Sequence, residues 1–89
     1  MAISIIKTKR LQAKKLANKF VIKNPIRNII LKNRSHTDIN VWFDSERVED
    51  SYVLERNETT PPIKVQENTI HYSVAEGEGE ANFIILMWE

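Results

Sequence analysis

Two histidines are the side chains of this sequence best suited to transferring a proton near neutral pH. His36 falls in a polar stretch and His71 in an alternating apolar run, and no pattern places a serine nucleophile beside either one. Nucleophilic catalysis needs a serine or cysteine within reach of such a base, and the chain has no cysteine. We therefore predict that both histidines are turn or surface residues and that the protein is not an enzyme.

Two acidic segments, residues 44–50 and 76–80, offer oxygen atoms that could bind calcium. Neither has the Asp-x-Asp-x-Asp-Gly order of an EF-hand loop. Carboxylate-rich turns without that order are usually solvated. We predict that the protein has no metal site, no cofactor and no catalytic residue.

Charge is distributed very unevenly along the chain. The net charge is only +1, from 13 Lys/Arg and 12 Asp/Glu, but all the acidic residues lie after residue 34 and most of the basic ones lie before residue 35. Such asymmetry is typical of a basic arm that binds phosphate, and equally of basic strands that lie against acidic loops of the same or a neighbouring copy. The candidate partner contacts in the first 19 residues are Lys7, Lys9, Arg10, Lys14, Lys15 and Lys19.

The size of the chain favours a partner on physical grounds. At 89 residues it can form one small domain whose core buries a smaller fraction of the surface than a larger domain does. No disulfide can add stability, because there is no thiol. The apolar run 83–88 is about a third of the roughly 20 residues that a membrane span needs. We expect oligomer formation or docking on a larger body, no membrane partner, and no secretory signal.

Strand patterns dominate from residue 20 onward. Short apolar runs flank Pro25, alternation marks 39–44 and 70–74, and Pro61-Pro62 favours a sheet edge before the next apolar positions. The pattern predicts an all-β fold, a small antiparallel β-sandwich or jelly-roll-like domain of six to seven short strands over residues 20–89. Residues 1–19 are predicted to be a basic N-terminal arm. Either an extended arm or a short helix through Ala13 and Leu16 fits them, and we favour the extended form.

The last strand is apolar on both faces. Phe83, Ile85 and Met87 alternate with a second apolar set, whereas a strand in a two-layer sandwich has only one core face. The second face must be covered by the N-terminal arm or by another subunit. Tryptophan is enriched at interfaces, and one tryptophan also lies opposite the core side of residues 39–43. The candidate interface residues are Trp42, Ile84, Leu86 and Trp88.

Several turn motifs carry a resemblance to a known group of proteins. Residues 24–35 read N-P-I-R-N-I-I-L-K-N-R-S, residues 54–58 read L-E-R-N-E, and a Gly-containing turn precedes the last strand. Over residues 20–88 the chain resembles the small β-sandwich structural proteins of tailed bacteriophages, although Arg56-Asn57-Glu58 stands where Pro-Gly-Glu is usual. These motifs encode turns, and no catalytic residue is carried over from the resemblance.

The resemblance implies a non-enzymatic virion structural protein. It would be a capsid decoration or auxiliary protein, made in the host cytoplasm and located in the virion. Its partners would be other virion proteins (major capsid, fibre or tail proteins) and further copies of itself. The alternative is a nucleic-acid-binding protein that uses the basic N-terminal segment, whose single aromatic residue, Phe20, gives no stacking platform for bases.

Overall fold

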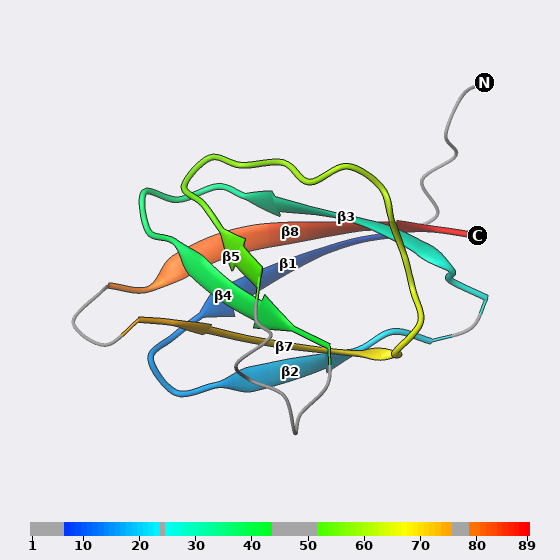
Figure 1. Ribbon diagram of the computed structural model, residues 1–89, viewed down its shortest axis with the longest axis horizontal. Helices are drawn as coiled ribbons and strands as arrows, with labels where there is room; N and C mark the ends of the chain where they lie inside the picture. The colour runs from blue at the N-terminus through cyan, green and yellow to red at the C-terminus, as the bar shows by residue number, and fades with distance from the viewer. Residues whose placement is uncertain (1–6, 24, 44–51, 76–78) are drawn as a thin grey trace.

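The computed structural model describes residues 7–23, 25–43, 52–75 and 79–89. Within these ranges the chain forms two antiparallel four-stranded sheets and no helix (Figure 1), so the prediction of an all-β sandwich is confirmed. The strands are β1 (Lys7–Ala13), β2 (Asn18–Val21), β3 (Asn28–Asn33), β4 (Ile39–Trp42), β5 (Tyr52–Leu54), β6 (Ile63–Lys64), β7 (Thr69–Val74) and β8 (Ala81–Trp88).

The strand order pairs the first strand with the last, the second with the seventh, and so on inward along the chain. Sheet A has the order β1-β8-β3-β6 and sheet B the order β2-β7-β4-β5. Consequently β1 pairs with β8, β2 with β7, β3 with β6 and β4 with β5, each pair antiparallel. This connectivity is the jelly roll, the eight-stranded form of the two-layer sandwich.

Alternating side chains from the two sheets build one core between them. Every second residue of β8 from Ala81 to Met87 is buried in this core, and so is every second residue of β7 from Ile70 to Val74. Tyr72 of sheet B meets Phe83 of sheet A edge to face, with ring centroids 5.0 Å apart and planes at 70°. Edge-to-face contact suits the ring quadrupoles, so this pair fastens the two layers at the centre of the core.

The sandwich begins earlier than the predicted boundary at residue 20. Residues 7–13 form strand β1 along the whole length of β8, and residues 18–21 form β2 in the other sheet. Leu11 and Ala13 face the core, while Leu16, part of the helical alternative, is 85% exposed in the turn between the two strands. The described part of the predicted arm is therefore part of the fold. β1 is an edge strand that pairs with β8 on one side only, so its lysine side chains can reach water from the open edge.

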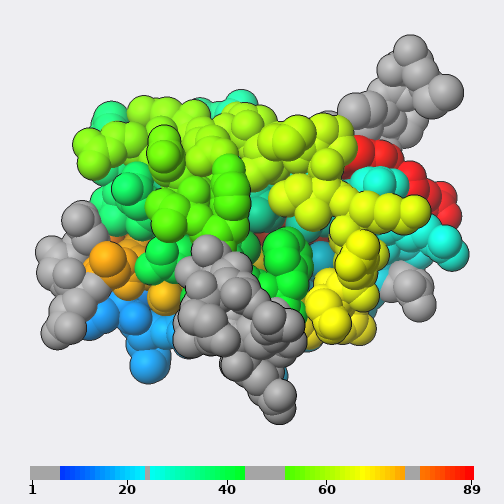
Figure 2. Space-filling view, in the orientation of Figure 1, coloured from blue at the N-terminus to red at the C-terminus, as the bar shows by residue number. Residues whose placement is uncertain are grey.

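One buried polar side chain fixes the long connection between β5 and β6. Asn33 is 1% exposed, and its Nδ2 lies 2.8 Å from the carbonyl oxygen of Thr37, 3.0 Å from that of Leu54 and 3.1 Å from that of Glu55. Its Oδ1 accepts hydrogen bonds from the backbone and side chain of Ser35. The polar stretch 33–38, read as a turn from sequence, thus also supplies a buried anchor. Figure 2 shows the anchored connection, coloured green to yellow, across the upper part of the face in view.

Candidate functional site

The outer face of sheet A carries an apolar stripe. β8 lies between β1 and β3, so its outward side chains Ile84, Leu86 and Trp88 occupy the middle of the sheet. Ile30 of β3 lies directly across from Leu86 and extends the set. We call Ile30, Ile84, Leu86 and Trp88 the apolar stripe; all four are partly exposed. Sheet B covers the other side, and the described residues contain no third layer.

Cationic side chains surround this stripe. Arg10 of β1 and Lys32 of β3 lie on either side of Ile84, in one cross-strand row. Lys64 of β6 shares the row of Asn28 and Trp88 at the other end. No outward position on the described strands of sheet A is acidic. The described strand residues of this face therefore carry positive charges only, while the acids Glu80 and Glu89 lie just before and just after β8. Cations beside an apolar surface favour a partner with negative charge.

A groove of about 590 Å³ opens at one end of the stripe. Its polar lining comes from three strands: Arg10 and Gln12 on β1, Asn82 on β8, and Arg34 directly after β3. The apolar residues in its lining are Leu11, Phe83 and Ile84. We call Arg10, Gln12, Arg34 and Asn82 the polar groove. Two of its side chains are positively charged guanidinium groups, and the other two are neutral amides that can donate N–H groups. This combination fits an anion.

The structure separates the basic residues that the sequence grouped into one arm. Lys7 and Lys9 pair with Met87 and Ile85, on the core side of β1, yet both side chains are exposed at the open edge of the sandwich. Charged residues on the core side of an edge strand discourage pairing with another chain. These two lysines thus have a structural explanation that needs no partner.

The remaining basic residues of the arm point to different surfaces. Lys14 and Lys15 lie in the turn after β1, and Lys19 lies across from His71 on sheet B. Only Arg10 shares a face with the apolar stripe. The described residues of the arm therefore do not form the continuous cationic stripe expected of a nucleic-acid-binding segment.

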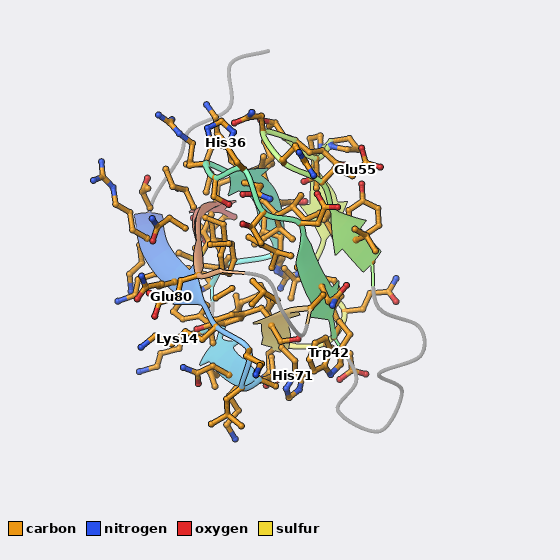
Figure 3. All side chains as sticks on the ribbon, turned by 90° about the vertical axis from the view of Figure 1, so that its left-hand side faces the viewer. Lys14, His36, Trp42, Glu55, His71 and Glu80 are labelled. Atoms are coloured by element: carbon orange, nitrogen blue, oxygen red, sulfur yellow. The ribbon has the colours of Figure 1, made fainter. Side chains whose placement is uncertain are left out.

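Trp42 does not join the other candidate interface residues. It lies on β4 of sheet B, is 8% exposed, and stacks on His71 of the neighbouring strand (Figure 3). Ile84, Leu86 and Trp88 lie together on sheet A, as predicted from the two-faced pattern. The four predicted residues thus divide between the two sheets, and three of them form a common surface.

The two histidines lie on separate parts of the fold. His36 is exposed in the turn after β3, far from His71 (Figure 3). In the part of the chain that the structure describes, no three His, Cys, Asp or Glu side chains are placed to hold a metal ion. The acidic residues 44–50 and 76–78 lie outside the described residues. The described residues contain no helix, and therefore none that is long and apolar enough to cross a membrane.

Sequence reasoning missed the cations that complete the site. Lys32 lies on β3, Arg34 directly after β3 and Lys64 on β6, all distant in sequence from Arg10. Only the pairing of β3 with β8 and β6 brings them to one face. Alternation within β3 was the available signal, since it places Ile30, Lys32 and Arg34 on one side. Comparison with protein-family models, curated proteins and solved structures gives no match.

Proposed function

We propose that this protein is a non-enzymatic assembly protein that docks on another protein through the apolar stripe. The observation that carries the proposal is the position of Ile84, Leu86 and Trp88, which lie on the outward face of a central strand. Core packing requires only the inward face of such a strand. Contiguous apolar surface with a polar and charged rim is characteristic of protein interfaces, and tryptophan is frequent among the residues that dominate binding.

A virion role is the more specific form of this proposal. Its support is the resemblance of residues 20–88 to small structural proteins of tailed bacteriophages, together with the jelly-roll connectivity, which recurs in viral capsid proteins and also in lectins and cupins. One fold hosts many functions, so this support is an analogy. In this form the protein decorates a capsid or serves as an auxiliary virion component, and its partners are other virion proteins and further copies of itself. Mass spectrometry of purified particles tests it, and absence of the chain from them contradicts it.

Docking can be measured in two ways that share the same variants. Light scattering reports self-association as a mass above the 10.4 kDa of one chain. Selection from a library of random displayed peptides reports docking of another protein's segment. Leu86→Asp should abolish whichever association the wild type shows, because it places a carboxylate in the middle of the apolar stripe. Its melting temperature should change little, since Leu86 lies on the outer face.

The matched control is Val53→Asp. Val53 is 47% exposed on β5 and lies across from Asn40, on the outer side of sheet B, so the variant introduces the same charge on the opposite face. It should associate as the wild type does. Association that depends equally on both positions, or on neither, would show that the apolar stripe is not the docking surface.

Binding of nucleic acid is the second candidate, and the cations around the stripe favour it. Contact with phosphates would make the affinity for random DNA fall with salt, with a log–log slope of about 0.9 per phosphate contact. Against it, Trp88 is the one aromatic residue among the described outward positions of the face that carries Arg10 and Lys32, so bases would find little to stack on. Failure to bind DNA at low salt would dismiss this candidate.

A further inference from the structure

We propose that the polar groove binds the carboxylate of an acidic side chain on the protein that covers the apolar stripe. This inference rests on the proposed function and adds the chemistry of the partner. The partner would present apolar side chains to Leu86 and Ile30 and an Asp or Glu to Arg10 and Arg34. The groove and the stripe meet at Ile84, which belongs to both.

The strand register explains why the four groove side chains converge. Gln12 lies across from Asn82, and the backbone N–H of Arg34 donates to the carbonyl oxygen of Asn82 over 2.9 Å, so these three residues form one row over β1, β8 and the end of β3. Arg10 lies in the next outward row, across from Ile84. The two arginines therefore flank β8 from opposite sides, and the amide side chains lie between and beside them.

These groove side chains are not used inside the described fold. Arg10, Gln12, Arg34 and Asn82 are all exposed, and no hydrogen bond or ion pair joins any of their side chains to another described residue. The ion pair between described residues is that of Arg56 with Asp38, elsewhere on the molecule. The groove is lined by these guanidinium and amide side chains, which a ligand in it would meet.

The donor set fits an anion with two or more oxygens, and a carboxylate attached to an apolar segment fits the whole site. Guanidinium groups present a planar fork that matches two oxygens of one carboxylate, and hydrogen bonds of this charge-assisted kind are shorter and stronger than neutral ones. The side-chain amides of Gln12 and Asn82 can donate further N–H groups. The groove is open to the apolar stripe along Ile84, so the same ligand must also offer apolar surface. A protein segment meets both requirements, whereas a nucleic acid would need stacking partners beside the arginines.

Charge also argues against a second copy seated face to face on the stripe. A twofold interface places the same patch of each copy against itself. Two such faces would bring Arg10, Lys32, Arg34 and Lys64 of one copy close to the same cations of the other, which is a repulsive arrangement. The occupant is therefore a different, acidic surface.

The test is a selection of random displayed peptides on the immobilised full chain, followed by affinity measurement with the best peptide. We expect selected sequences to combine apolar residues with Asp or Glu. Replacing that acidic residue by its amide should weaken binding to the wild type about tenfold, the loss of one charge-assisted contact. On the variant with both Arg10→Gln and Arg34→Gln, the acidic and amide peptides should bind equally. The control variant with Lys14→Gln and Lys15→Gln removes the same charge from the turn after β1 and should behave as the wild type.

The other possible results of this experiment would contradict either the carboxylate site, the docking surface, or both. Selected peptides that are apolar but not acidic, and that lose binding on Leu86→Asp, would overturn the carboxylate site and leave the docking surface standing. Acidic peptides that bind through Arg10 and Arg34 but ignore Leu86→Asp would overturn the docking surface and leave the anion groove. An oligothymidylate that displaces the peptides and binds more tightly through the same arginines would show a phosphate site. Absence of any selected peptide would overturn both.

Discussion

Trp42 of β4 and His71 of β7 stack face to face, with ring centroids 5.6 Å apart and planes inclined by 12°. The two residues are direct cross-strand partners on the outer side of sheet B. Trp42 is only 8% exposed although it lies outside the core between the sheets. The imidazole thus covers one face of an indole, and this tryptophan is used within the chain while Trp88 on the other sheet remains on the candidate docking surface.

Removing the imidazole should loosen this stack. We expect His71→Ala to lower the free energy of unfolding by about 1 kcal/mol, the usual magnitude for a stacked pair. It should also shift the emission of Trp42 to longer wavelength, measured in a Trp88→Phe background so that a single indole reports. Ser73→Ala, at the next outward position of β7, is the control and should change neither quantity. An unchanged emission in the histidine variant would contradict the stack.

Asn33 should be the most sensitive polar position in the described fold. Asn33→Ala leaves the carbonyl oxygens of Leu54 and Glu55 without their donor, and it removes the acceptor for Ser35. Unpaired buried polar groups are costly, so the free energy of unfolding should fall by about 3 kcal/mol in a urea titration. Asn28→Ala, at a half-buried outward position of the same strand, should cost less than about 1 kcal/mol. Equal losses for the two variants would show that the buried hydrogen bonds contribute little.

The turn directly after β5 depends on a left-handed residue. Asn57 has φ of 59°, and the N–H of Glu58 donates to the carbonyl oxygen of Glu55 over 3.0 Å, which closes the turn. Asparagine therefore occupies the position where the phage-type motif has glycine, and it adopts a conformation that both residues tolerate. We expect Asn57→Gly to preserve or slightly raise the melting temperature and Asn57→Val to cost about 1–2 kcal/mol. Arg56→Ala, which loses only an exposed 4.0 Å ion pair with Asp38, should have little effect, and a valine variant as stable as the wild type would contradict the left-handed turn.

Both tyrosines should resist ionisation in the folded protein. The hydrogen bond from the Tyr52 hydroxyl to Glu58, with smaller contributions from burial and from the charges of Glu58 and Glu55, raises the pKa of Tyr52 above its ordinary value of 10.0. Burial raises the pKa of Tyr72 in the same direction. A raised pKa in the folded state means that the stabilising contribution is complete below pH 10.0 and is lost as the pH rises through the folded-state values.

Phenolate absorbance during an alkaline titration measures this effect. In the folded protein both tyrosines should ionise above pH 10.0, and stability should decline over the same range. Glu58→Gln removes the carboxylate and should lower the pKa of Tyr52 toward its ordinary value while leaving Tyr72 unchanged. Ionisation of both groups at the ordinary value while the protein stays folded would contradict the hydrogen bond and the burial.

Local pattern in the sequence determined several of the strands after residue 20 and their inward faces. Alternation over 81–88 and 70–74 corresponds to β8 and β7, and Pro61-Pro62 directly precedes β6 at the edge of sheet A. The two-faced pattern of β8 also located Ile84, Leu86 and Trp88, because side chains alternate along any strand whatever its neighbours are. The lack of cysteine was likewise a property of composition alone.

Only the tertiary structure decided which strands lie side by side, and with them the polar groove. Arg10, Asn82 and Arg34 come from distant parts of the chain and meet because β8 lies between β1 and β3. The same long-range pairing made residues 7–13 an edge strand, where one side stays open to water and lysines are tolerated. It also enclosed Asn33, whose polar neighbours in sequence are typical of a turn. Local periodicity sets the face on which a side chain lies, whereas its neighbours across a sheet depend on pairing free energies summed over the whole chain.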